Sequence, residues 1–370
     1  MKVVSGQPLS NVRGHVDAAR PATPAAGGPS RRILPAATAP LSRRNSRLSW
    51  TPPPSRRPGR GRSVAAMANS EVLSIERDGH VATLWLDRPE ARNAMGPAFW
   101  ADLPLAMGEL SDDRSVRAVV VAARGPHFSV GLDLKAMAGL LTGDGGGGSH
   151  GPDDGPGHAG GPGGSNGSGD AGGPGGGRPS MAARAFTARP SILRMQRSVT
   201  AVAECPKPVI AAIHGYCIGG GVDLAAACDI RVASADAVFS VRETRVAIVA
   251  DLGSLQRLPR IIGKGHVAEL ALTGRDITAA RAREIGLVND VLPDAESALG
   301  AAYRLAAEIS ANSPLAVQGT KAVLAACEDK SVADGLDYVA TWNAGFLQSD
   351  DLVEAMTAFM EKRPPEFRGR

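Results

Sequence analysis

Length, composition and charge set the first limits on what this chain of 370 residues can be. Hydrophobic residues make up 43% and charged residues 21%, which is typical of a folded globular protein and excludes disorder along the whole chain. The net charge of +4 is unevenly placed. Eleven arginines and Lys2 against the single acid Asp17 give the first 66 residues a charge of +11, which leaves −7 on the remainder. We therefore expect no nucleic-acid partner for the folded part.

The cysteines and the apolar runs exclude further classes. Cys205, Cys217, Cys228 and Cys327 form no CxxC pair and have no histidine at metal-ligand spacing, which indicates a reduced, intracellular protein without a bound metal. No apolar run approaches the roughly 20 residues required to cross a bilayer, and the amino terminus lacks the hydrophobic segment of a secretory signal. We therefore expect a soluble protein that does not enter a membrane.

Residues 1–66 are rich in Arg, Pro and Ser and lack apolar periodicity, so we expect a disordered tail. Three interpretations stay open: an extended reading frame with the true start at Met67, an organellar transit peptide, and a functional basic arm. A start near Met67 predicts a cytoplasmic protein, whereas a transit peptide predicts an organellar matrix. The carboxy-terminal RGR is not a peroxisomal signal.

Two folded segments are expected after the tail. Residues 67–275 are predicted to form an α/β core, and residues 276–370 a carboxy-terminal helical region used in self-association. The core is interrupted at 143–177 by a glycine-dominated stretch with the composition of a flexible linker, which predicts a disordered surface insertion. His150 and His158 in this insertion lack the geometry of a metal site.

The first part of the core is predicted to contain three strands and a helix. Strands are expected at 72–76, 80–86 and 118–123, and a helix at 97–110. Asp78-Gly79 predicts a hairpin turn between the first two strands. Pro104 and Gly108 are expected to kink or weaken the helix. The third strand is wholly apolar, as in a parallel sheet buried on both faces.

After the insertion, the pattern predicts a β-α-β unit followed mainly by helices. The unit comprises a helix at 191–204, a strand at 208–213, a small-residue helix at 219–228 and a strand at 229–233. The later helices are expected at 279–285, 295–310, 314–327 and 351–362, with Ser313 as the cap of the third.

Three consecutive glycines, Gly219 to Gly221, stand between a predicted buried strand and a helix. They leave backbone N–H groups uncovered at the positive end of the helix dipole, where an anion or an oxyanion can bind. Taken alone, the triplet is better explained by close packing of the helix on the sheet. Neither phosphate-binding fingerprint, GxGxxG or GxxxxGK[ST], is present.

Three acids follow in apolar surroundings. Asp223 stands in the first turn of the predicted helix, Glu243 in FSVRETRVAIV and Asp251 in VADLGSLQRLP. Acids among apolar neighbours have raised pKa values and can exchange protons near neutral pH. The alternative is a set of salt bridges with the nearby arginines Arg242, Arg245 and Arg257.

A second loop, GPHFSVGLDL at 125–134, follows the strand at 118–123. Its glycine-flanked turn can present another backbone N–H group. Two such donors aimed at one thioester oxygen form an oxyanion hole, which stabilises the negative charge of a transition state. The alternative is an ordinary connection from strand to helix, capped by Asp133.

Together, three motifs in this order resemble the crotonase (enoyl-CoA hydratase/isomerase) superfamily. They are RPEARNAM at 88–95, VVVAARGPHFSVGLDL at 119–134 and HGYCIGGGVDLAAACDIR at 214–231. The resemblance covers roughly residues 71–362 without the insertion. It implies a spiral of repeated β-β-α units, a carboxy-terminal helical region that builds trimers or hexamers, and an acyl-CoA substrate whose coenzyme A is part of the substrate, with no cofactor and no metal.

The resemblance also implies the site. The N–H groups of Leu132 and Gly220 correspond to the oxyanion hole that polarises the thioester. Contacts to the substrate or its coenzyme A are implied for residues around these two loops, namely Arg92, Asn93, Ala94, Phe128, Ser129, Gly131, Asp133, Leu134, Gly219 and Gly221.

The acids indicate a subgroup. Hydratases of the superfamily carry Glu at the positions of Asp223 and Glu243, and this sequence departs from them at the first. Dienoyl-CoA isomerases are more similar, because they carry Asp, then Glu, then a further Asp that matches Asp251. CPKPVIAAIHG, SPLAVQG and LDYVATWN also resemble that subgroup.

The expected reaction is the conversion of 3,5-dienoyl-CoA to 2,4-dienoyl-CoA in fatty-acid β-oxidation. One base removes a proton from C2, the oxyanion hole holds the dienolate, and an acid returns a proton at C6. Glu243 and Asp251 are the expected pair, and Asp223 tunes or positions them. Two alternatives stay open: a 2-enoyl-CoA hydratase, and a non-catalytic module that binds RNA or a protein.

Overall fold

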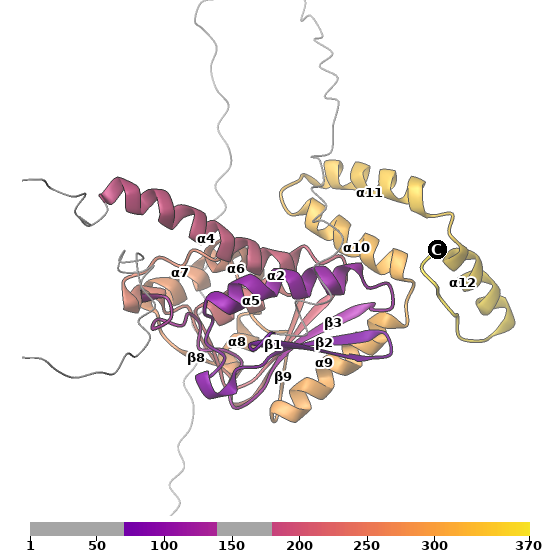
Figure 1. The fold of residues 1–370 in the computed structure, drawn as a ribbon. Helices are drawn as coiled ribbons and strands as arrows, with labels where there is room; N and C mark the ends of the chain where they lie inside the picture. Colours follow the sequence, from indigo (N-terminus) through magenta and orange to yellow (C-terminus); the bar gives the residue numbers. More distant parts are fainter. Residues whose placement is uncertain (1–69, 139–179) are drawn as a thin grey trace, which may run out of the picture. The chain divides into compact units, whose positions relative to one another are not determined.

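The computed structural model describes residues 70–138 and 180–370 (Figure 1). The predicted tail at 1–66 and the predicted insertion at 143–177 lie outside the described residues. Six strands form the main sheet, in the order β1-β2-β3-β4-β6-β9. Within this sheet only β1 and β2 pair antiparallel, and the other neighbours are parallel. The strands are β1 (Leu73–Asp78), β2 (Val81–Leu86), β3 (Ala118–Ala123), β4 (Val209–Ile213), β6 (Ile230–Ser234) and β9 (Asp290–Leu292).

The main sheet is covered on both faces because its central strands are apolar on both sides. In β3, Val119 and Val121 face the larger core cluster, whereas Ala118 and Val120 face a second cluster. Helix α9 (Ala295–Ser310) covers this second face through contacts with β3, β4 and β6. The other face carries α2 (Pro97–Asp112), α4 (Met181–Ala203) and α5 (Gly220–Ala227).

A second, three-stranded sheet holds the segments around the candidate site. It comprises β5 (Tyr216–Ile218), β7 (Val238–Ser240) and β8 (Ile277–Thr278), in that order. Ser129, in the loop after β3, forms a parallel bridge with Cys217 of β5. The loop after β3 and the strand before α5 therefore lie side by side. The remaining elements of the core are η1 (Pro89–Ala91), η2 (Glu243–Val246), α6 (Ser254–Ile261), α7 (Lys264–Thr273) and α8 (Ala279–Glu284).

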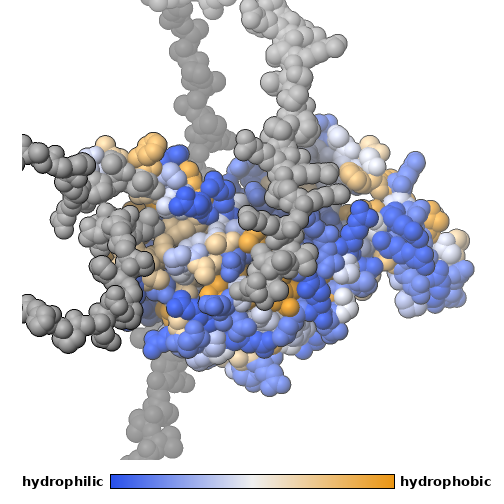
Figure 2. All heavy atoms as spheres, viewed as in Figure 1, coloured by the Kyte–Doolittle hydropathy of each residue, from blue (hydrophilic) through white to orange (hydrophobic). Residues whose placement is uncertain are grey.

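The carboxy-terminal helices are α10 (Pro314–Cys327), α11 (Val332–Phe346) and α12 (Asp350–Glu361). Ser313 caps α10 by accepting a hydrogen bond from Ala316 N, as predicted. Hydrophobic surface shows between hydrophilic side chains over these helices (Figure 2). Their exposed large apolar residues are Leu324, Val332, Leu336, Phe346, Leu352, Val353, Met356, Phe359 and Met360.

Helix α2 does not break at its proline, contrary to the expectation of a weakened second half. It runs unbroken from Pro97 to Asp112. Pro104 has no N–H group for the carbonyl of Trp100, four residues earlier. The hydroxyl of Ser198 in α4 donates to this carbonyl instead, at 2.6 Å. A hydrogen bond from a neighbouring helix therefore satisfies the acceptor that proline leaves unpaired.

Most predicted elements are present, and the missed ones are the short strands, η1, η2 and three helices, of which α11 has 15 residues. The hairpin forms as predicted, although Asp78 pairs with Val81, so the turn is centred on Gly79 and His80. Residues 276–370, predicted as helical, begin with two strands, β8 and β9, which pair into the two sheets. The other elements that the pattern did not predict are β5, β7, α6, α7 and α11. No helix of the described residues is long and apolar enough to span a membrane.

Candidate active site

The loop that carries Leu132 meets the start of α5 through Gly131. A Cβ atom built on Gly131 would lie 3.2 Å from Gly220 N and 2.6 Å from Ile218 O, so the two loops are in direct contact. Met95 holds the first loop, because Met95 N donates to Gly131 O at 2.8 Å and Asp133 N donates to Met95 O at 3.0 Å. Within the described residues, no acceptor is bound to the N–H group of Leu132 or Gly220. The two predicted oxyanion donors are thus brought together and left available.

Two buried polar side chains fix these loops. Asn93 accepts a hydrogen bond from Arg88 N and donates to the carbonyls of Arg124 and His127, each at 2.9 Å. Ser129 donates to Asn93 O at 2.8 Å and accepts from Gly131 N at 3.1 Å. Since these polar groups are already used within the protein, the side chains of Asn93 and Ser129 serve as loop supports. Their backbone N–H and carbonyl groups are also hydrogen-bonded within the protein, and the substrate contacts at these two positions stay predictions.

The other predicted contact residues divide into core and surface. Phe128 is fully buried in the main core. Gly221 permits close packing, because a Cβ there would lie 3.1 Å from Ser129 O. Asp133 pairs with Arg88 at 2.9 Å, and its pKa is lowered by the backbone N–H of Ala136 and by that arginine. Arg92 and Leu134 are exposed, whereas Ala94 and Gly219 are half-buried.

Asp223 is the most deeply buried of the three acids, with 1% of its surface exposed. Its Oδ1 atom accepts two hydrogen bonds from Ser254, one from the backbone N–H at 2.6 Å and one from the hydroxyl at 2.7 Å. Burial raises the pKa of Asp223 to about 6, while the two bonds from Ser254 and the positive charge of Arg257 oppose that rise.

Glu243 begins η2 and reaches back to the glycine triplet. A Cβ on Gly219 would lie 3.3 Å from Glu243 Oε1, so this carboxylate stands beside the start of α5. The Oε2 atom is buried and has no hydrogen-bond partner among residues 70–138 and 180–370. Burial, with smaller contributions from Asp223 and Asp251, raises the pKa of Glu243 to about 7. A carboxyl with this pKa is half-protonated at neutral pH and can accept or donate a proton.

Asp251 lies in the turn before α6, where Gln196 of α4 donates to its backbone carbonyl at 2.7 Å. Burial raises its pKa as well. Its negative charge raises the pKa values of Asp223 and Glu243, so the three carboxyl groups lie within electrostatic reach of one another. The three predicted acids therefore lie near one another, and Glu243 stands beside the glycine triplet that contains the predicted donor Gly220.

The alternative of salt bridges to neighbouring arginines is wrong for these acids. Arg242 pairs with Asp276, and the side chain of Arg245 lies against Gly274. Arg257 donates to Leu252 O and to the hydroxyl of Thr200. Within the described residues no salt bridge involves the three acids, so their charges lack direct counter-ions.

Sequence reasoning missed Ser254 and Trp100 at this site, and it considered Arg257 only as a salt-bridge partner. Ser254 binds Asp223, and Arg257 acts on the same carboxylate from one turn along α6. Trp100 lies against Gly220 and has a buried indole N–H without a partner in the described residues. For Ser254, the signal was its place in the motif DLGSLQR at 251–257, between Asp251 and Arg257.

Comparison with known proteins places this arrangement in a family. Residues 76–146 and 180–370 match the family model for enoyl-CoA hydratase/isomerase. The chain therefore belongs to the enoyl-CoA hydratase/isomerase family, and its predicted crotonase fold is confirmed. An enoyl-CoA hydratase of Bacillus anthracis of known structure is 28% identical, with a TM-score of 0.66 over 81% of this chain and 100% of that chain.

Two curated relatives are more similar in sequence. The mitochondrial Delta(3,5)-Delta(2,4)-dienoyl-CoA isomerase of Rattus norvegicus is 44% identical over 79% of this chain and 80% of its own length. The peroxisomal Delta(3,5)-Delta(2,4)-dienoyl-CoA isomerase of Arabidopsis thaliana is 41% identical over 80% of this chain and 96% of its own length.

Proposed function

We propose that this protein is a dienoyl-CoA isomerase that converts 3,5-dienoyl-CoA to 2,4-dienoyl-CoA. The observation that carries the proposal is the third carboxyl group, Asp251, beside Glu243 and Asp223. Moving two conjugated double bonds along the chain requires proton removal and proton return at carbons several ångströms apart, so two separate acid–base groups are needed. The names of the curated relatives agree with this reaction.

In the proposed reaction the thioester oxygen accepts hydrogen bonds from the N–H groups of Leu132 and Gly220. One of Glu243 and Asp251 removes the proton at C2, and the electron pair of the C–H bond delocalises onto the thioester oxygen as a dienolate. The other acid then delivers a proton to C6, which leaves double bonds at C2 and C4 and an unchanged atomic composition. The oxyanion hole stabilises the charge that develops in the first step.

A 2-enoyl-CoA hydratase is the main competing function, because Asp223 and Glu243 occupy the two hydratase positions. Hydration requires two carboxylates that hold one water against the double bond. Asp223 is almost fully buried, and one of its oxygens is bound twice by Ser254. This engagement favours a fixed charge over a water-holding role. A non-catalytic binding module is disfavoured by three acids with raised pKa values beside two available N–H donors.

Ultraviolet absorbance with two substrates separates these functions. With 3,5-dienoyl-CoA, we expect the band of the conjugated 2,4-dienoyl thioester to grow. With 2-enoyl-CoA, we expect loss of the enoyl band to be at least 100-fold slower. Fast loss of the enoyl band without any 2,4-dienoyl product would establish a hydratase and overturn the proposal.

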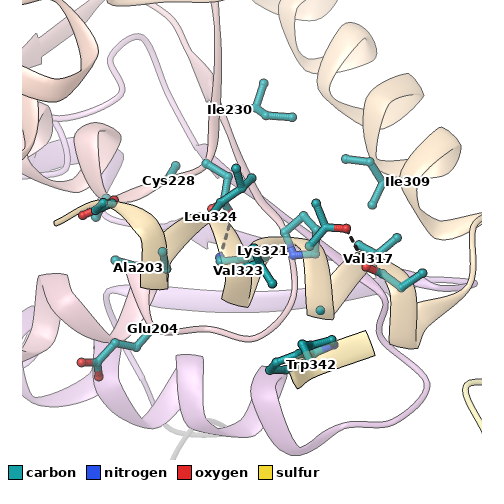
Figure 3. A pocket seen from close by; sticks show the side chains of 18 of the residues that line it. Ala203, Glu204, Cys228, Ile230, Ile309, Val317, Lys321, Val323, Leu324 and Trp342 are labelled. Atoms are coloured by element: carbon teal, nitrogen blue, oxygen red, sulfur yellow. Dashed lines mark hydrogen bonds and ion pairs between the residues drawn. The ribbon is translucent and has the colours of Figure 1, made fainter. Parts of the chain in front are cut away.

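We infer further that the chain self-associates into trimers, or hexamers of two trimers, through α10 to α12. These helices expose a run of large apolar residues, and Phe359 is 85% exposed. A cavity of about 1740 Å³ separates α10 and α11 from the core. Figure 3 shows part of its lining, with Lys321, Val323 and Leu324 on α10 and Trp342 on α11. Asp251, Gly253 and Arg257 line one part of this cavity, whereas Glu243 and Gly220 do not, so we assign only the part between α10 and α11 to assembly.

Light scattering after gel filtration tests the assembly. We expect a mass of three or six times 38.0 kDa. Val353→Asp combined with Phe359→Asp is expected to yield monomers, whereas the charge change Glu361→Gln at the end of the same helix is expected to leave the mass unchanged. A wild-type monomer at micromolar concentration would contradict the inference.

For localisation we infer an organellar matrix. The relatives named above are mitochondrial and peroxisomal, and residues 1–66 have the arginine-rich, acid-poor composition of a transit peptide. Fluorescent fusions in a eukaryotic cell test this: the full chain is expected in an organelle, and a chain that starts at Met67 in the cytoplasm. Identical cytoplasmic distribution of both would overturn it.

A further inference from the structure

The first residue of helix α6 supplies two hydrogen-bond donors to Asp223. Ser254 is the first residue of α6 and is fully buried. Both of its donors, the backbone N–H and the hydroxyl, bind the same oxygen, Asp223 Oδ1, at 2.6 and 2.7 Å. Two short hydrogen bonds to one carboxylate oxygen favour the ionised form and fix its orientation.

Gly253 allows a positive charge to lie close to this contact. It has a φ of 130°, and a Cβ atom there would lie 1.8 Å from Arg257 Nη1. The guanidinium therefore lies directly over Gly253, where it donates to Leu252 O at 3.2 Å and to Thr200 Oγ1 at 3.1 Å. Anchored in this way, Arg257 acts on Asp223 through its charge and does not contact it in a salt bridge.

The other ionisable groups around Asp223 oppose its ionisation. Asp251, in the turn before α6, and Glu243, in η2, interact with it as acids. Cys217, in β5, is fully buried, and burial raises the pKa of its thiol well above the usual value, so it carries no charge at neutral pH. Ser254 and Arg257 are thus the groups that favour the Asp223 anion among the described residues.

We propose that Ser254 is a positioning residue that holds Asp223 as a fixed anion, with Gly253 and Arg257 completing the arrangement, so that the exchangeable proton resides on Glu243. This inference rests on the proposed isomerase function for its catalytic consequence. Its structural part, the dependence of Asp223 ionisation on the Ser254 hydroxyl, does not require any activity.

Thermal unfolding as a function of pH tests the structural part. The folded-state pKa of Asp223 is raised above its unfolded value, so stability is lost as pH rises through about 6. Ser254→Ala raises that pKa further. We therefore expect the Tm difference between wild type and Ser254→Ala to grow by on the order of 3 °C between pH 4.5 and pH 8.

Two comparisons make this test specific. In an Asp223→Asn background, Ser254→Ala is expected to shift the Tm equally at all pH values, because no ionisation is left to support. Ser310→Ala is the matched control: it removes another buried serine hydroxyl, which donates to the carbonyl of Ala306, and is expected to show no growth of the Tm difference with pH. A pH-independent effect of Ser254→Ala in the wild-type background would overturn the proposal.

Kinetics test the catalytic consequence. Ser254→Ala is expected to lower kcat for 3,5-dienoyl-CoA about tenfold, with KM changed less than twofold, and Ser254→Thr, which keeps the hydroxyl, to restore most of kcat. An unchanged kcat together with the predicted Tm pattern would reject the catalytic role of Ser254 alone. If the wild-type protein failed to isomerise 3,5-dienoyl-CoA, the proposed function would fail, while the unfolding comparison would still decide the contact between Ser254 and Asp223.

Discussion

Glu243 shows at the scale of single residues how this site departs from an ordinary protein interior. Buried carboxyl groups are normally paired with a cation or fully hydrogen-bonded, because an isolated buried charge is costly. Glu243 Oε2 has no partner in the described residues, and Asp223 and Asp251 add negative charge nearby. Such an arrangement lowers the stability of the fold and is typical of a site selected for proton transfer.

Glu243→Gln should therefore stabilise the protein at alkaline pH while it removes activity. The folded-state pKa of Glu243 is raised to about 7, so its contribution to stability is fully present below pH 4.5 and is lost as pH rises through 7. We expect the variant to exceed wild type by on the order of 2 kcal/mol in unfolding free energy at pH 8, and by nothing near pH 4.5. Urea unfolding at both pH values measures this, and a variant less stable at pH 8 would contradict it.

The pH dependence of turnover should report the ionisation of Glu243. If Glu243 removes the C2 proton it must be ionised, so kcat/KM rises as pH increases through about 7. If Glu243 returns the proton at C6 it must be protonated, and kcat/KM falls over the same range. Initial rates between pH 5.5 and 9 distinguish these roles. A flat profile between pH 6 and pH 8 would exclude Glu243 from proton transfer.

At the scale of elements, the two proposed oxyanion donors lie on loops whose glycines allow them to touch. Gly131 has a φ of 84°, and a Cβ there would lie 2.6 Å from Ile218 O. A side chain at this position must therefore push the loop after β3 away from α5. We therefore expect such a side chain to change the separation of the N–H groups of Leu132 and Gly220.

Gly131→Ala is expected to lower kcat at least 100-fold and to cost about 1–3 kcal/mol of stability, because it adds backbone strain and displaces one oxyanion donor. Gly108→Ala is the matched control: it lies within α2, nothing stands within 4 Å of its added Cβ, and it should be stabilising by about 0.5–1 kcal/mol with unchanged turnover. Equal turnover in the two variants would show that the contact between the loops does not determine the position of the N–H groups of Leu132 and Gly220.

The sequence permits prediction of the long and strongly patterned elements. β3 is wholly apolar, α9 and α10 carry clear caps, and each was predicted with the bounds that the structure shows. β5, β7 and β8 have two or three residues each, too few for a periodic signal. Continuity of α2 through Pro104 depends on Ser198, 94 residues away, and no local pattern reports such a partner.

The candidate site, too, could be predicted only in part, because local sequence does not report contacts between distant segments. The three acids could be predicted because they stand in apolar sequence and match a family pattern. Their freedom from salt bridges could not be predicted, since Arg242, Arg245 and Arg257 are close in sequence and the fold directs them elsewhere. Ser254 was missed because a serine at a helix start is commonly a cap, and only the fold brings Asp223 to it.

At the scale of the whole molecule, the residues assigned to the site all lie between 92 and 257. A chain that starts at Met67 should therefore isomerise 3,5-dienoyl-CoA with kcat/KM within about twofold of the full chain. Side-by-side initial rates measure this. A loss of more than tenfold with an unchanged Tm would show that the tail contributes to catalysis.

The most direct test of the account is the growth of 2,4-dienoyl-CoA absorbance with wild type, Asp251→Asn and Asp276→Asn. Asp276 is the matched control, because it is an acid paired with Arg242 and has no assigned role in the reaction. We predict rapid growth of the 2,4-dienoyl-CoA absorbance with wild type and Asp276→Asn, and a rate at least 100-fold lower with Asp251→Asn. Undiminished growth with Asp251→Asn would contradict the three-carboxylate isomerase.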